Sequence, residues 1–486
     1  MPLSESALDA LRAPNSVARL GVPEGLVEDL FMRRVLTERS LTIGEAARAL
    51  CIAHQTAMEL AEALRSKAML EFLGATGRDY RIQLTELGHH TTSQRMAGGH
   101  HVGPVPVSLA DYEAVVAAQA AVPKLDRQTM RQAFSDLIVE DGLLDQIGPA
   151  FVSGGAIFLY GPPGTGKTSL AERLNRVVSD PVLIPRFVEI DGRLISVYDP
   201  SLHVPLETQP AQVDHRYVLC ERPLIVVGGE LDRRMLDLSY DRISGTHTAP
   251  VQMLANNGIL VVDDFGRQAV RPDELLNRWI VPLSRGIDYL QANGSKFSVP
   301  FELKLVVSTN LDPNSLGDDA FLRRLRNKVF VGPISDHAFH QVLTGAAAAR
   351  GITVDPTAAD HLAEVARREI GELRPYLPVD FCQLTGAICD YEQIEQRLDV
   401  AMVERVADLY FVQGEAEEME DRRLDPWDLP GAPLPAPVPD EYETVPAGGE
   451  NILDGLEALA MTQSVDGLEN LDSIPTALRP EVGYGN

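Results

Sequence analysis

A glycine-rich segment near the middle of the chain has the spacing of a loop that binds phosphate. Its pattern is G-x-x-x-x-G-K-[ST], and it follows an apolar run and opens a helical segment, which is the context that this motif requires. Backbone N–H groups and the positive end of a helix attract phosphate oxygens at such a place. We therefore predict a nucleotide phosphate site. It comprises Gly161, Pro162, Pro163, Gly164, Thr165, Gly166, Lys167, Thr168 and Ser169.

Four side chains in and after this loop have the chemistry that a nucleoside triphosphate needs. Lys167 is expected to reach the β- and γ-phosphates, and the Thr168 hydroxyl is expected to bind Mg²⁺. The apolar run 259–262 ends in Asp263 and Asp264. Asp263 is predicted to hold the Mg²⁺ shell, and Asp264 is placed as the general base for an attacking water. Alternatively, either carboxylate caps the next helix. The cofactors that follow are ATP and Mg²⁺.

Further polar residues follow the next apolar run, 303–308. Asn310 can orient an attacking water, although asparagine at a strand end is also a common turn former. Three arginines then lie in one short stretch, at Arg323, Arg324 and Arg326. An arginine presented to a neighbouring subunit's γ-phosphate stabilises the transition state of phosphoryl transfer, whereas the alternative is a solvated helix face.

Apolar runs that alternate with helical segments predict a parallel α/β sheet beneath these motifs. After the sheet, residues 336–412 lack strand signals and predict a helical bundle. The long stretch 191–248 predicts either loops that face a pore or a partner, or an irregular cover for the sheet. The runs that we assign to the sheet are 156–160, 187–190, 224–227, 259–262, 303–308 and 328–331.

The N-terminal region, 22–97, predicts a winged-helix-like domain. Thr42 and Glu45 have the spacing of a capping box, and a helical pair runs from there to residue 67. Two short apolar runs separated by a polar turn then predict a β-hairpin over 69–84. The following residues, 98–134, are rich in Gly, Pro and His at their start and are predicted to be a linker.

Taken in order along the chain, these motifs resemble an AAA+ ATPase over about residues 135–412. The approach to the two aspartates resembles that of the MoxR and chelatase branch. The chain as a whole is similar to bacterial AAA+ proteins that carry an N-terminal winged-helix-like region and are described as ATPases with chaperone activity. The resemblance implies an α/β P-loop NTPase core over 135–333 and a helical lid over 334–414.

The resemblance also implies roles for single residues. It places the Walker A motif at the phosphate loop and the Walker B motif at the two aspartates. Asn310 becomes sensor 1, and Arg323 or Arg324 becomes the arginine finger. A finger acts across a subunit interface, so the resemblance implies a homo-oligomer, usually a hexameric ring.

The chain departs from the family pattern at two places. The Walker B pair is Asp-Asp rather than Asp-Glu, which predicts slow hydrolysis. Many relatives have a Pro-Arg-Asp triplet whose arginine is sensor 2, but here the triplet is Pro378, Val379 and Asp380. Arg374, four residues before Pro378, is the candidate substitute for that arginine in nucleotide binding.

Composition excludes several classes of protein. The 486 residues carry a formal charge of −27, whereas proteins that coat nucleic acid are usually basic. Four cysteines in this length exclude a disulfide scaffold. The sequence contains no run of about 18 apolar residues, so it predicts no membrane span. The first 20 residues lack the apolar core of a signal peptide. We therefore expect a cytoplasmic protein.

The acidic charge is concentrated in the last 72 residues, 415–486, which hold 17 acidic and 3 basic side chains. Such a Pro-rich, acidic composition predicts a disordered tail. A D-G-L-E-x-L motif occurs at 454–459 and again at 466–471. This repeat predicts two linear docking sites for a protein partner, unless it is drift in a low-complexity tail.

Three functions are consistent with this sequence. The first is an ATP-driven ring that remodels a protein client, bound through the winged-helix-like domain or the tail. The second is a nucleotide-regulated transcription factor, although residues 1–110 have a net charge of only −1 and thus lack the basic surface of a DNA-binding domain. The third is a nucleotide-bound scaffold with very slow turnover.

The arginine finger makes a testable prediction. Replacing Arg323 or Arg324 by alanine should abolish ATP hydrolysis while ATP binding is retained, because a finger stabilises charge in the transition state rather than the bound nucleotide. Steady-state phosphate release and ATP affinity measure the two effects. Normal hydrolysis in both variants contradicts a finger in this stretch.

Overall fold

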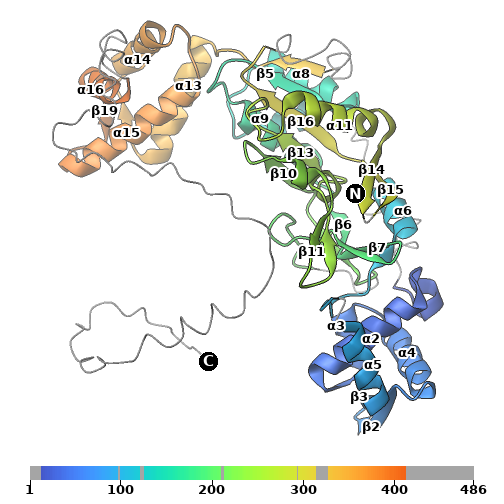
Figure 1. Ribbon diagram of the computed structural model, residues 1–486. Coiled ribbons are helices and arrows are strands. Elements are labelled where there is room, and N and C mark those ends of the chain that lie inside the picture. Colours follow the sequence, from blue (N-terminus) through green and yellow to red (C-terminus); the bar gives the residue numbers. More distant parts are fainter. Residues whose placement is uncertain are drawn as a thin grey trace, which may run out of the picture. The chain divides into compact units, whose positions relative to one another are not determined.

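Figure 1 shows a computed structural model of the chain. The residues that it describes are 13–96, 99–120, 125–208, 213–292, 294–312 and 327–411. Arg323 and Arg324 lie outside the described residues, as does the acidic segment 415–486 with its repeated motif. Within the described ranges, no helix combines the length and the apolar character that crossing a membrane requires. The four cysteines are free.

Five parallel strands form the central sheet. They are β5 (Ile157–Tyr160), β10 (Leu224–Val227), β13 (Ile259–Val262), β16 (Lys304–Thr309) and β17 (Asn327–Phe330). Their order is β10-β13-β16-β5-β17, and every neighbouring pair is parallel. The strand sequences are largely apolar because a parallel sheet is covered on both faces. The predicted parallel α/β sheet is therefore confirmed.

Each face of this sheet has its own core. Ile157 and Val261 pack in one cluster with α7, α8, α9 and η2, whereas Phe158 lies in another cluster with Trp279 of α11. Alternate residues of one strand thus point to opposite cores, and burial of each large apolar side chain contributes about 1.5–3 kcal/mol. The helices are α7 (Arg127–Ala133), α8 (Asp141–Val152), α9 (Lys167–Arg173), η2 (Leu174–Val177) and α11 (Pro272–Arg285).

The run 187–190 was predicted for the parallel sheet, and this assignment is wrong. It is strand β7 (Phe187–Ile190), which pairs antiparallel with β8 (Arg193–Ser196) in a second sheet. Asp191 and Gly192 both have positive φ values, 51° and 79°. Positive φ at both central residues is what a type I′ turn requires, and the twist of that turn suits a two-residue hairpin. The local turn chemistry therefore directs this strand away from the central sheet.

The long stretch after β7 contributes further strands rather than only loops. The second sheet has the order β11-β12-β8-β7-β4, and β6-β9 and β14-β15 are two separate antiparallel pairs. The strands are β4 (Val107–Ser108), β6 (Val182–Pro185), β9 (Tyr217–Cys220), β11 (Ser239–Asp241), β12 (Thr246–Thr248), β14 (Ile287–Ala292) and β15 (Ser295–Pro300). The stretch 191–248 is thus more regular than either alternative predicted.

Part of the predicted linker 98–134 is a packed helix, α6 (Leu109–Gln119). Its Ser108 cap accepts a hydrogen bond from the Asp111 amide, and Tyr112 is buried in the core. At its end the Gln119 side chain accepts from the Leu183 amide over 2.6 Å and donates to the Leu183 carbonyl over 3.1 Å. These bonds fasten α6 to strand β6, so this part of the segment is not an extended connection.

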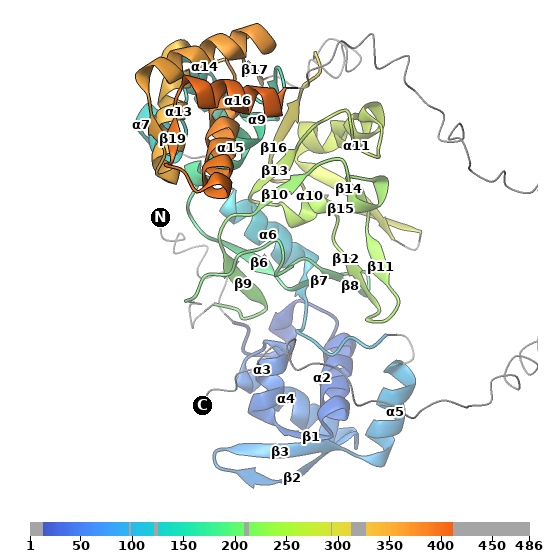
Figure 2. The same cartoon turned by 90° about the vertical axis from the view of Figure 1, so that its left-hand side faces the viewer.

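The N-terminal unit contains the helical pair and the hairpin that the sequence predicts (Figure 2). Thr42 and Glu45 form both bonds of the capping box, and those bonds hold the pKa of Glu45 below its usual value. Three antiparallel strands lie in the order β1-β3-β2. The elements are α2 (Glu24–Glu38), β1 (Ser40–Thr42), α3 (Ile43–Leu50), α4 (His54–Ser66), β2 (Leu70–Thr76), β3 (Asp79–Leu84) and α5 (Glu86–Met96).

The C-terminal helical bundle has a hydrophobic core of its own, centred on residues such as Phe381 and Leu362. It is helical as predicted, but it also contains a short parallel pair of strands, β18 and β19. Two residues in each strand are too few to leave a sequence signal. The elements are α13 (Asp336–Arg350), β18 (Thr353–Val354), α14 (Pro356–Glu369), α15 (Tyr376–Glu392), β19 (Arg397–Leu398) and α16 (Val400–Tyr410).

The anchor of α6 predicts a stability effect. Gln119→Ala removes the partners of a buried amide and a buried carbonyl, and each unsatisfied group costs about 1–3 kcal/mol. We expect a lower melting temperature and faster amide hydrogen exchange at Leu183. Gln128→Ala, at an exposed position of α7, is the matched control and should leave both unchanged. Equal behaviour of the two variants contradicts the anchor.

Candidate nucleotide-binding site

The phosphate-loop motif forms a tight turn between β5 and α9. Gly161, Gly164 and Gly166 have φ values of 150°, 75° and 88°, which residues with a side chain rarely adopt. A Cβ at Gly161 would lie only 2.1 Å from the Val331 carbonyl oxygen. The loop therefore needs its glycines for both conformation and space, as expected of a loop that wraps around phosphate.

Lys167 is the first residue of α9, and its side chain is held inside the loop with 6% of its surface exposed. Its Nζ donates hydrogen bonds to the carbonyl oxygens of Gly161 and Pro162, over 3.0 and 2.7 Å. A third bond, of 2.7 Å, goes to Oδ1 of Asn310. These three acceptors are uncharged, so the ammonium group retains its attraction for an anion.

Burial lowers the pKa of Lys167, although the carboxylates of Asp263 and Asp264 act in the opposite direction. Desolvation of the ammonium is thus only partly offset by the surrounding groups. Phosphate oxygens would supply the negative charge that this position lacks. The electrostatics therefore favour an anionic ligand here.

Thr168 and Asp263 place two oxygen atoms side by side, because the Thr168 hydroxyl donates to Oδ2 of Asp263 over 2.7 Å. A hydroxyl and a single carboxylate fit Mg²⁺, which is usually bound through one or two protein oxygens, with water and substrate phosphates in its other positions. Among the described residues, no group of three or more His, Cys, Asp or Glu side chains could hold a metal ion alone. The residues therefore fit a Mg²⁺ that arrives with nucleotide.

Asp264 and Asn310 complete the group. Asn310 donates from Nδ2 to Oδ1 of Asp264 over 3.3 Å, while its Oδ1 accepts from Lys167. Asp264 is exposed to solvent and has the left-handed φ of 47°. Its carboxylate can therefore contact a water molecule, and the Asn310 amide connects it to the buried lysine.

The parallel sheet brings these residues together. β5, β16 and β13 are neighbours, and the loop, Asn310 and the two aspartates each follow the carboxyl end of one of them. The carboxyl ends of parallel strands lie at the same edge, where ligands of open α/β sheets bind. The structure thus places Lys167, Thr168, Asp263, Asp264 and Asn310 at one edge, as their predicted roles require.

The start of α15 also approaches the loop. The positive charge of Arg374 lowers the pKa of Lys167 further. The Arg374 guanidinium pairs with Glu372 over 2.7 Å. Tyr376 lies so close to Gly164 that a Cβ on that glycine would be 2.2 Å from the ring. Tyr376 was not predicted from the sequence. The only signal for it is an aromatic residue at the start of a helix. In the triplet 378–380, which differs from the family pattern, Asp380 accepts a hydrogen bond from the Tyr410 hydroxyl over 2.8 Å.

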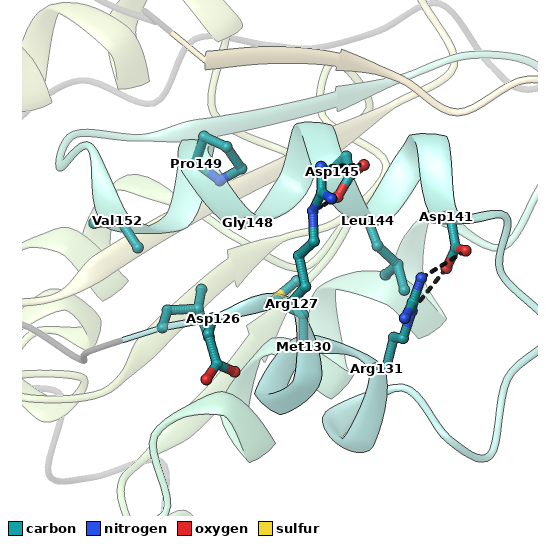
Figure 3. Close-up of a pocket in the computed structure, with 11 residues that line it drawn as sticks. Asp126, Arg127, Met130, Arg131, Asp141, Leu144, Asp145, Gly148, Pro149 and Val152 are labelled. Carbon is teal, nitrogen blue, oxygen red and sulfur yellow. Dashed lines mark hydrogen bonds and ion pairs between the residues drawn. The ribbon is translucent and has the colours of Figure 1, made fainter.

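A separate cavity of about 380 Å³ lies between α7 and α8 (Figure 3). Its floor includes Met130 and Leu144. The arginines at its rim are paired, Arg127 with Asp145 at 2.8 Å and a second arginine of α7 with an aspartate of α8. No residue that lines it belongs to the phosphate loop or follows β13 or β16. This cavity is therefore not part of the candidate site.

Comparisons with known proteins add little to this geometry. A family model described as a domain of unknown function (DUF8689) matches residues 335–409, within the helical bundle. No curated protein matches the chain. Two solved structures with similarity are the Thermotoga maritima RuvB Holliday junction branch migration motor and NtrX from Brucella abortus.

The similarity to these structures is weak. The RuvB structure is 13% identical with a TM-score of 0.31, covering 59% of this chain and 70% of that chain. The NtrX structure is 12% identical with a TM-score of 0.36, covering 69% and 63%. Similarity at this level assigns no activity to the chain.

Proposed function

We propose that this chain is a Mg²⁺-dependent ATPase of the AAA+ type. The observation that carries the proposal is the group at the carboxyl edge of the sheet, where a buried lysine, a hydroxyl–carboxylate pair, a second carboxylate and an amide converge. A phosphate loop alone is compatible with kinases and switches. The addition of a solvent-exposed carboxylate bridged to the lysine by Asn310 favours hydrolysis by water.

In this proposal each residue has one task. Lys167 exchanges its carbonyl acceptors for the β- and γ-phosphate oxygens and stabilises the charge that grows there. Thr168 and Asp263 hold Mg²⁺, which supplies electrostatic stabilisation of the phosphates when bound. Asp264 accepts the proton of the attacking water. Asn310 fixes the position of that carboxylate relative to the Lys167 ammonium group. Arg374 leaves Glu372 and binds phosphate.

We further propose that the ATPase works as an oligomeric ring, with Arg323 or Arg324 acting in trans, and that it remodels a protein partner. The N-terminal unit favours protein over DNA. On α4, the exposed side chains include Glu59 and Glu62, whereas Arg65 lies over the Phe72 ring at 5.1 Å. Because Arg65 is exposed as well, α4 presents acidic and basic side chains together, and the helix lacks the basic surface that binding to DNA phosphates needs.

The two alternatives remain distinct from this proposal. A DNA-binding transcription factor would need a basic surface, which the mixed charges of α4 do not supply. A scaffold with negligible turnover is consistent with Asp264, which is one carbon shorter than glutamate. Separate measurements of hydrolysis and of DNA binding distinguish these functions.

Hydrolysis is tested with two variants. Asp264→Asn should bind ATP as the wild type does but turn over at least about 100-fold more slowly, because asparagine tolerates the left-handed backbone but is no base. Lys167→Ala should lose ATP binding. Fluorescent-nucleotide titration and phosphate release measure the two effects. If wild-type phosphate release does not exceed that of Lys167→Ala, the chain is a scaffold and not an ATPase.

DNA binding is tested with a salt series. A labelled duplex titrated with the full chain at about 20 mM salt should give no measurable binding, because non-specific affinity depends on basic contacts and is greatest at low salt. Fluorescence anisotropy with and without ATP is the measurement. Binding that weakens steeply as salt rises contradicts the assignment of the N-terminal unit to a protein partner.

A further inference from the structure

The turn that follows β13 contains a side-chain clamp outside the predicted site. Gln268 donates from Nε2 to the carbonyl oxygens of Asp263 and Asp264, over 2.8 and 3.1 Å. Its Oε1 accepts from the Gly266 amide over 2.8 Å. The side-chain amide of Gln268 therefore makes all three of its hydrogen bonds with main-chain groups of the two Walker B aspartates and of Gly266.

A second set of bonds fixes the same turn to the neighbouring strand. The Phe265 amide donates to the Ser308 carbonyl, and the Thr309 hydroxyl donates to the Phe265 carbonyl, both over 2.7 Å. Phe265 is buried, with 1% of its surface exposed. The peptide group between Asp264 and Phe265 is thus held from two sides. Its N–H donates to β16, and its carbonyl oxygen accepts from Gln268, which also holds the carbonyl of Asp263.

Between these two attachments Asp264 has a left-handed backbone, with φ at 47°. A left-handed backbone is uncommon for residues with a side chain, although aspartate adopts it more readily than most, and here the surrounding bonds hold it in place. The direction in which the Asp264 carboxylate leaves the main chain depends on this backbone. An aspartate also has fewer torsions than a glutamate with which to correct a misplaced main chain.

We propose that Gln268 is a positioning residue for Asp264. It holds the backbone of the Walker B turn in the left-handed form that directs the short carboxylate to the attacking water. The inference deepens the proposed ATPase function and rests on it. Gln268 does not contact nucleotide in this account, so it acts on turnover through Asp264 and leaves ATP affinity unchanged.

A purely structural role for Gln268 makes a different forecast. If the clamp only stabilised the loop, its removal would lower ATP affinity or turnover by the same factor, whichever residue occupied position 264. A positioning role requires that its effect on turnover disappear once Asp264 can no longer act as a base. A double-mutant cycle therefore separates the two roles.

The experiment uses the full chain and measures phosphate release and ATP affinity. Gln268→Ala should lower kcat by about 10- to 100-fold, the range expected for a misplaced catalytic group, with KM for ATP within about twofold of the wild type. Gln268→Glu should be no better, because it keeps an acceptor for Gly266 but loses both donors. Gln128→Ala is the exposed glutamine control and should behave as the wild type.

The cycle is completed by adding Gln268→Ala to Asp264→Asn, where no further loss of kcat is expected. Wild-type kcat in Gln268→Ala, or an equal loss in both backgrounds, overturns the positioning role while the ATPase stands. A wild type with no more turnover than Lys167→Ala rejects the ATPase function and the positioning role together. The two failures are thus distinguished by the wild-type rate.

Discussion

The buried ammonium group of Lys167 is the interaction on which the candidate site depends. An ion removed from water costs free energy unless charge or hydrogen bonds replace the solvent. Here three neutral oxygens, from Gly161, Pro162 and Asn310, replace it, and the lowered pKa of Lys167 indicates that they do so incompletely. A ligand that carries negative charge would complete this replacement, which is the requirement for binding a nucleotide.

That arrangement requires the strand order of the central sheet. The Lys167 side chain meets Asn310 because β16 is the neighbour of β5, and the carboxylates stand beside them because β13 is the next strand. All three strands are parallel, so their carboxyl ends share one edge. Loss of register in β16 would separate the amide from the lysine. The apolar runs that bury both faces of the sheet therefore also determine the electrostatics of the site.

Much of this site could be predicted because its residues are adjacent to strand ends or belong to a fixed motif. Other parts depend on contacts that sequence spacing does not encode. The strand at 187–190 leaves the central sheet because of the turn at Asp191 and Gly192. The Gln268 clamp is made with main-chain groups of the turn after β13, and the approach of Tyr376 to Gly164 joins elements about two hundred residues apart. Predictions from spacing alone therefore missed Gln268, Tyr376 and the pairing of the strand at 187–190.

The geometry at Asp264 bears on whether the short carboxylate is compatible with turnover. A site that merely stores nucleotide needs the phosphate loop, but it does not need a strained backbone at the second aspartate. Aspartate adopts the left-handed form at a smaller cost than most residues with a side chain, and each hydrogen bond of the clamp contributes about 0.5–1.5 kcal/mol net. The three bonds of Gln268 are therefore sufficient to maintain it. The clamp thus fixes the direction of one exposed carboxylate, which the proposed hydrolysis requires and nucleotide storage does not.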